Sequence, residues 1–170
     1  MNLDPDVAFV SLSKLARTSV LHCRLKQEVE KNGWFPIQFG LGPNGGENNG
    51  RQVANLPEDL DHLVLPCGSG FAAAALLKGI NKYLTIEERP RQIHVVQIEG
   101  LDREVALQSP IPIKFVAYGV YSYSKKVRLC YKGLDLDSIY EAKAFEWLQK
   151  SDLQGRICFW VVGNFNRIRD

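Results

Sequence analysis

The sequence lacks the patterns that mark metal-binding and disulfide-rich proteins. Its four cysteines are scattered along 170 residues with no CxxC pair, and none of its three histidines stands at metal-ligand spacing. This distribution argues against a zinc site and against a disulfide scaffold, so no metal is predicted. We expect reduced thiols instead, with Cys23 buried in a helix and Cys158 buried in an apolar run.

Long apolar runs, a basic leader and a strong net charge are also missing. No stretch is long enough to span a bilayer, and the first six residues have neither the basic nor the apolar part of a secretory signal. The net charge is +2, and no basic stripe with interleaved aromatic residues is evident along the sequence. These absences predict a cytoplasmic protein with no membrane partner, and no nucleic-acid partner is evident.

What is present is the composition of a soluble globular protein. Hydrophobic residues make up 45% of the chain and charged residues 24%, and the length allows one domain with a sizeable core. There is no internal repeat and no low-complexity segment. We therefore expect residues 1–170 to form a single domain.

The segment from Leu63 to Leu77 is the most informative one. A short apolar strand runs into the turn Gly68-Ser69-Gly70, and an Ala/Leu helix begins directly after it. Such a turn places free backbone N–H groups at the positive end of a helix, where phosphate binds well. The alternative is an ordinary tight strand-to-helix turn in an α/β sheet.

Strands and helices alternate along the rest of the chain. Most predicted strands are continuous apolar runs, which is typical of a parallel sheet covered on both faces, so the predicted fold is a three-layer α/β domain with a mostly parallel sheet. Residues that follow strands should share one edge of that sheet. The predicted strands are 7–12, 34–39, 62–65, 92–98, 111–116 and 157–162; the predicted helices are 14–32, 70–80 and 138–150, with a short helical piece at 51–55.

Several polar and aromatic residues lie between or on these elements. Residues 40–50 read as a Gly/Asn loop, which is either functional or simply flexible. Tyr118 and Tyr121 belong to an aromatic turn that either lines a ligand pocket or packs at the surface. Lys78 and Lys143 are expected to be solvated on their helices.

Three segments, in order, resemble one enzyme family. Asp61 to Gly70, Leu136 to Ala144 and Ile157 to Asn164 are similar to segments of the tryptophan-synthase-β-like (fold type II) pyridoxal-phosphate enzymes. The second segment is similar to a helix start of the aminocyclopropane-carboxylate deaminase and D-cysteine desulfhydrase branch. The resemblance covers residues 34–165 and implies the large domain of these enzymes.

The resemblance also implies a cofactor, a reaction class and site residues. The cofactor would be pyridoxal phosphate, and the activity that of a lyase or deaminase on a small amino acid or amino-acid-like group. Glu99, which follows its strand, would approach the cofactor; the alternative is a solvated loop carboxylate. The remaining cofactor-binding residues implied are those of the turn and of the last strand end: Gly68, Ser69, Gly70, Phe71, Ala72, Gly163 and Asn164.

The sequence departs from the family pattern at important positions. Phe71 and Ala72 stand where the family extends its Gly-rich loop and adds a threonine, and Val162 stands where the family has a threonine or serine. The small domain that carries the catalytic lysine in the family is not apparent. These three departures weaken the prediction of present catalysis.

The missing lysine leaves two alignments open. In one, Lys14 is the catalytic lysine, and residues 48–54 are similar to the family's substrate loop, which makes Asn48 and Asn49 substrate residues. In the other, residues 1–33 are a strand-helix lead-in to the large domain alone, and a partner chain supplies the lysine. The open edge of the large domain then predicts self-association or a partner chain.

Three functional hypotheses follow. The first is a deaminase-like or desulfhydrase-like lyase, and the second is a non-catalytic domain with a relic phosphate site that serves binding or assembly. The third and weakest is a phosphate-ligand enzyme of another class. Pyridoxal phosphate gives a diagnostic absorbance when it is attached to a lysine, which separates the first hypothesis from the others.

Overall fold

The computed structural model describes residues 18–33, 43–68, 70–98, 111–118 and 124–161. The chain divides into two compact units, Met1–Phe39 and Gly40–Asp170. In the first unit, helix α1 (Thr18–Asn32) confirms most of the helix predicted over 14–32. Cys23 is exposed on α1, so the prediction that it is buried is wrong. It lies off the stripe formed by Leu25 and Val29, which are half-buried.

The second unit contains a four-stranded sheet in which every neighbouring pair of strands is parallel. The strand order is β3-β2-β1-β6, so the carboxyl ends of all four strands lie at the same edge. This confirms the parallel α/β architecture predicted from the sequence. The strands are β1 (His62–Cys67), β2 (Gln92–Gln97), β3 (Ile113–Ala117) and β6 (Ile157–Phe159).

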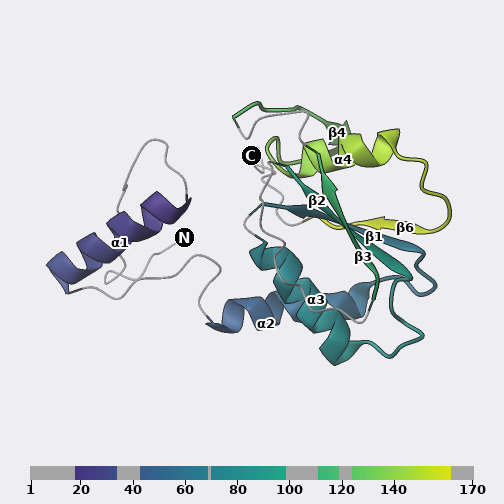
Figure 1. Ribbon diagram of the computed structural model, residues 1–170, viewed down its shortest axis with the longest axis horizontal. Coiled ribbons are helices and arrows are strands. Elements are labelled where there is room, and N and C mark those ends of the chain that lie inside the picture. Colours follow the sequence, from purple (N-terminus) through teal and green to yellow (C-terminus); the bar gives the residue numbers. More distant parts are fainter. Residues whose placement is uncertain (1–17, 34–42, 69, 99–110, 119–123, 162–170) are drawn as a thin grey trace. The chain divides into compact units, whose positions relative to one another are not determined.

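Helices cover both faces of this sheet and make three layers (Figure 1). On one face, Leu63 and Leu65 of β1 pack in the same cluster as residues of α3 (Phe71–Tyr83). On the other face, Val64 of β1 packs in a cluster with Ala144 of α4 (Glu141–Lys150). Five of the six β1 residues are buried, which explains why the strand is a continuous apolar run rather than an alternating one.

Helix α2 (Pro43–Arg51) occupies most of the segment predicted as a Gly/Asn loop, so that prediction is wrong. A 3₁₀ turn (Gln52–Asn55) follows it, as expected for the short helical piece at 51–55. Proline is favoured at the first position of a helix, and Pro43 stands there. The glycines that make the segment look like a loop are used for packing: Gly50 is buried, and a Cβ on it would lie 2.7 Å from the carbonyl oxygen of Ala75 on α3.

A short antiparallel hairpin that the sequence did not predict precedes α4. Strands β4 (Cys130–Tyr131) and β5 (Leu134–Asp135) are joined by Lys132 and Gly133, whose φ angles are 50° and 81°. Two consecutive positive φ angles are the signature of a type I′ turn. The signal in the sequence was the pair Lys132-Gly133 between two short segments that form strands.

Candidate functional site

The turn between β1 and α3 leaves the positive end of α3 open. No side chain in the described part of the chain caps this helix. Gly70 precedes it with a φ of 84°, a left-handed conformation that favours glycine, and its carbonyl accepts the hydrogen bond of Ala74 at 2.8 Å. The N–H groups of the first helical residues, Phe71 to Ala73, have no partner within the helix because they belong to its first turn. The arrangement suits an anion.

Gly68, at the start of the same turn, lies against the ring of Tyr140. A Cβ built on Gly68 would overlap the ring, with Cζ of Tyr140 only 2.8 Å away, so any other residue at this position would require the ring to move. Tyr140 is the residue before α4 and is held by Asp137, whose Oδ1 accepts the N–H groups of Ile139 at 3.0 Å and Tyr140 at 2.8 Å. The turn after β1 and the start of α4 therefore form one structural unit, although they are far apart in sequence.

The two helix starts in this unit differ in their chemistry. In the turn before α4, Asp137 accepts the N–H groups of Ile139 and Tyr140, and Oε2 of Glu141 accepts the N–H of Asp137 at 3.1 Å. Neither cap residue, Tyr140 or Gly70, makes a side-chain hydrogen bond to its helix, so the difference between the two starts is the pair of carboxylates beside α4. An incoming phosphate would therefore be drawn to the start of α3 rather than to the start of α4.

Two charged residues of α4 are almost completely buried. Glu141 is 1% exposed and Lys143 is 0% exposed, so the prediction that Lys143 is solvated is wrong. The physical reason is that this part of α4 is covered on both sides: Ala144 packs against the sheet, while Ala142 packs against Leu136. Lys78 on α3 is exposed, as predicted.

The structure separates the substrate residues suggested by the sequence. Asn48 is exposed and Asn49 half-buried, and both lie on α2, which packs against α3 on one face of the sheet. Tyr118 follows β3, is 8% exposed and packs on the opposite face, where its hydroxyl accepts a hydrogen bond from Lys150 at 3.2 Å. These residues do not come together in one site.

The other predicted site residues lie outside the described part of the chain. Since β1, β2 and β6 are parallel, their carboxyl ends do share an edge of the sheet. The residues outside the description are Lys14, Ser69, Glu99, Tyr121, Val162, Gly163 and Asn164.

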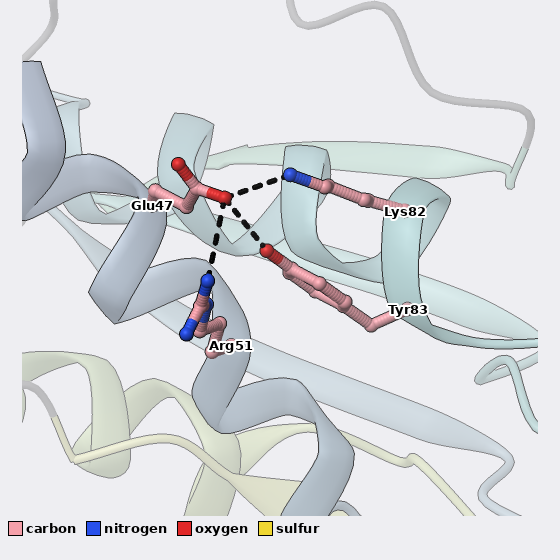
Figure 2. Close-up of polar contacts among 4 residues, drawn as sticks. All are labelled: Glu47, Arg51, Lys82 and Tyr83. Carbon is pink, nitrogen blue, oxygen red and sulfur yellow. Dashed lines mark hydrogen bonds and ion pairs between the residues drawn. The ribbon is translucent and has the colours of Figure 1, made fainter.

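Sequence reasoning missed a polar cluster between α2 and α3 (Figure 2). Oε1 of Glu47 accepts hydrogen bonds from Nζ of Lys82 at 2.7 Å and from the hydroxyl of Tyr83 at 3.1 Å, and it lies 3.8 Å from the guanidinium of Arg51. The hydrogen bond from Lys82 is the main reason that the pKa of Glu47 is lowered. The i,i+4 spacing of Glu47 and Arg51 would have revealed this pair had the helix been recognised.

Glu47, Lys82 and Tyr83 border a shallow groove of about 410 Å³ between the two helices. Gly46 and Phe71 line one part of it, and Lys78 and Tyr83 another. Phe71, the first residue of α3, is 37% exposed and contributes a ring rather than a polar group. The groove therefore adds no hydroxyl to the start of α3.

A histidine pair lies on the face of the sheet that α4 covers. Nε2 of His94 is 3.2 Å from Nδ1 of His62, and the ring of Trp147 on α4 lies 5.6 Å from that of His94. His94 is completely buried, and its Nδ1 makes no hydrogen bond with any described residue. The pKa of His94 is lowered to about 4. Burial is the main cause, and the charges of His62 and Lys114 contribute less.

Comparisons with known proteins identify no relative. No family model, no curated protein and no solved structure matches the chain. Among the described residues, no group of three or more His, Cys, Asp or Glu side chains could hold a metal ion. No helix in the same ranges is long and apolar enough to cross a membrane.

Proposed function

We propose that this chain is similar to the large domain of a fold-type-II pyridoxal-phosphate enzyme and takes part in lyase or deaminase chemistry on a small amino acid or amino-acid-like group. The observation that carries the proposal is the open start of α3 behind Gly68 and Gly70. The resemblance of Asp61 to Gly70 and of Leu136 to Ala144 to that family supports it. So does the contact between Gly68 and Tyr140, which joins these two segments.

The described residues fit the phosphate of this cofactor. Gly68 lets the ring of Tyr140 pack against the turn, and Gly70 leads the chain into α3, whose first N–H groups, those of Phe71 and Ala72, have no partner within the helix. Pyridoxal phosphate, when bound, supplies an electron sink for carbanion chemistry and needs a lysine amine. That amine would be Lys14 or a lysine of a partner chain.

The alternative is a non-catalytic domain that keeps the anion site for binding or assembly. Phe71 favours the non-catalytic domain. Its apolar side chain lines the groove beside α2, whereas the family resemblance predicts a polar loop at this position. Val162, in place of a hydroxyl residue, favours it as well. The two proposals share the phosphate site and differ in the presence of a lysine adduct.

Titration of the purified chain with pyridoxal phosphate tests both. Binding at the start of α3 is expected to stabilise the protein by about 2.7 kcal/mol at a hundredfold excess over Kd, which raises Tm by roughly 5–10 °C. A lysine adduct adds an absorbance band at about 410–430 nm, which Lys14→Ala removes if Lys14 supplies the amine. Stabilisation without the band excludes a lysine of this chain and supports the non-catalytic domain unless a partner chain restores the band, and the absence of both effects contradicts both proposals.

Ala72→Asp locates the site. The new carboxylate lies in the first turn of α3, where it favours the helix but repels phosphate, so we expect a folded protein that pyridoxal phosphate no longer stabilises. Asn81→Asp makes the same charge change at an exposed position near the other end of α3 and should keep the response. Equal loss in both variants would show that the phosphate binds elsewhere.

A further inference from the structure

The groove between α2 and α3 runs along one side of α3. Its lining residues on this helix recur every three or four positions from Phe71 to Tyr83, so they form a single stripe. Lys78 lies two turns after Phe71, about 10 Å further along the helix axis. On the other side, the groove is bordered by residues of α2, Gly46 and Glu47 among them. A ring and a cation therefore lie in one groove, separated by a fixed length of helix.

The middle of this stripe carries no bulky side chain. Ala74 and Ala75 end in a methyl group, Gly79 has no side chain, and all three residues line the groove. The ring of Phe71 lines the same groove and is 37% exposed. A flat apolar molecule can therefore lie along the stripe with one end against this ring.

The groove has an excess of positive charge. Glu47 is the only carboxylate among the described lining residues, and its Oε1 lies 2.7 Å from Nζ of Lys82 and 3.8 Å from the guanidinium of Arg51 (Figure 2). Lys78 is exposed and forms no ion pair with a carboxylate of the described chain. One carboxylate thus faces three cations, and Lys78 remains to bind an incoming anion.

The size and lining of the groove suit a small molecule. A volume of about 410 Å³ lies within the range of small-molecule sites, which are mainly apolar and use a few polar groups to orient the ligand. The charge of Lys78 matches one negative charge on the ligand. The exposed ring of Phe71 matches a second ring, since two aromatic rings attract each other beyond the effect of the area that they bury.

We propose that the groove between α2 and α3 binds an aromatic monocarboxylate. The ring of the ligand packs on Phe71 and on the alanines of the stripe, and its carboxylate pairs with Lys78. A neutral aromatic molecule would leave the lysine without a partner, and a straight acyl chain would gain no ring contact. The binding involves neither a phosphate nor a lysine adduct, so it does not depend on the proposed cofactor chemistry.

Isothermal titration calorimetry of the purified full chain with 2-naphthoate tests the proposal. The neutral amide of the same ring system and octanoate, which has the charge without the ring, should each bind at least threefold more weakly. Lys78→Gln is expected to weaken the binding of 2-naphthoate at least threefold and to leave that of the amide unchanged. The control Lys132→Gln removes the same charge at an exposed position in the hairpin before α4 and should leave both unchanged.

Filling the groove is the second test. A Cβ at Gly46 would lie 3.7 Å from Cζ of Phe71, so Gly46→Leu is tolerated by the backbone but places its side chain where the ring of the ligand lies. We expect at least a tenfold loss of 2-naphthoate binding. Asn48→Leu adds the same side chain at an exposed position of α2 outside the groove and should keep the binding. Thermal unfolding of each variant verifies that it is folded.

Four results would overturn the proposal. The first is no binding of 2-naphthoate at concentrations up to about 1 mM. The second is equally tight binding of the amide or of octanoate, which would show that the charge or the ring is not recognised. The third is equal loss of binding in Lys78→Gln and Lys132→Gln, and the fourth is unchanged binding in a folded Gly46→Leu variant.

Discussion

Replacing Gly79 with alanine is expected to lower the free energy of unfolding by about 2–3 kcal/mol, although alanine is normally the better helix former by about 1 kcal/mol. A Cβ at this position of α3 would overlap Gly50 of α2, with the Cα of Gly50 2.7 Å away and its carbonyl group closer still. The contacts are with backbone atoms, so no side-chain rotation relieves them and the two helices must separate. Urea denaturation followed by circular dichroism measures the change.

Gly46→Ala is the matched control on the partner helix. A Cβ at Gly46 would lie 3.7 Å from Cζ of Phe71, an ordinary van der Waals distance. This substitution should therefore show the intrinsic preference of a helix for alanine and stabilise the protein by about 0.5–1 kcal/mol. If Gly79→Ala were as stable as Gly46→Ala, the close crossing of α2 and α3 would be refuted.

The sheet and its main helices could be predicted because their burial leaves a local trace. β1 and β2 are buried on both faces, so they appear as continuous apolar runs that end at turns. α3 is buried along most of its length and appears as an Ala/Leu run after the glycine turn. In each case the signal lies within the segment itself, and only the ends of the elements were shifted by a few residues.

α2 could not be predicted in this way, because the reason for it lies outside its own sequence. Glycine and asparagine have low helix propensity, and the segment 43–50 is rich in both. What makes the helix favourable is its packing on α3, where Gly50 and Gly79 allow a close approach and Glu47 bonds to Lys82. A local pattern of residues cannot show a partner that lies about thirty positions further along the chain.

The candidate site shows the same limit. The glycine turn after β1 was visible from its residues alone, but nothing local indicated that the ring of Tyr140 lies on Gly68. Likewise, Lys143 reads as an ordinary helical lysine, and only the layers on both sides of α4 bury it. The sequence therefore located the glycine turn at the start of α3, while the residues around it became evident only through long-range packing.

Lowering the pH from 7 to 5 is expected to reduce the free energy of unfolding by about 2 kcal/mol through His94 alone. The ordinary pKa of histidine is 6.5, and the folded protein lowers that of His94 to about 4. Between these values the unfolded chain binds a proton that the folded chain does not, so stability falls as the pH drops through this window and levels off below about 4. The full effect is about 3 kcal/mol. Urea denaturation at several pH values, followed by tryptophan fluorescence, measures the curve.

His94→Leu should flatten the curve between pH 7 and 5, since no imidazole then has to stay neutral inside the fold. It also removes a buried Nδ1 that has no partner among the described residues, so stability at pH 7 should not fall by more than about 1 kcal/mol. His62→Gln is the control: it removes the neighbouring charge, the smaller contribution, and leaves His94 buried, so most of the pH dependence should remain. A flat curve in the unsubstituted protein, or a curve that His62→Gln abolishes and His94→Leu does not, would contradict the assignment to His94.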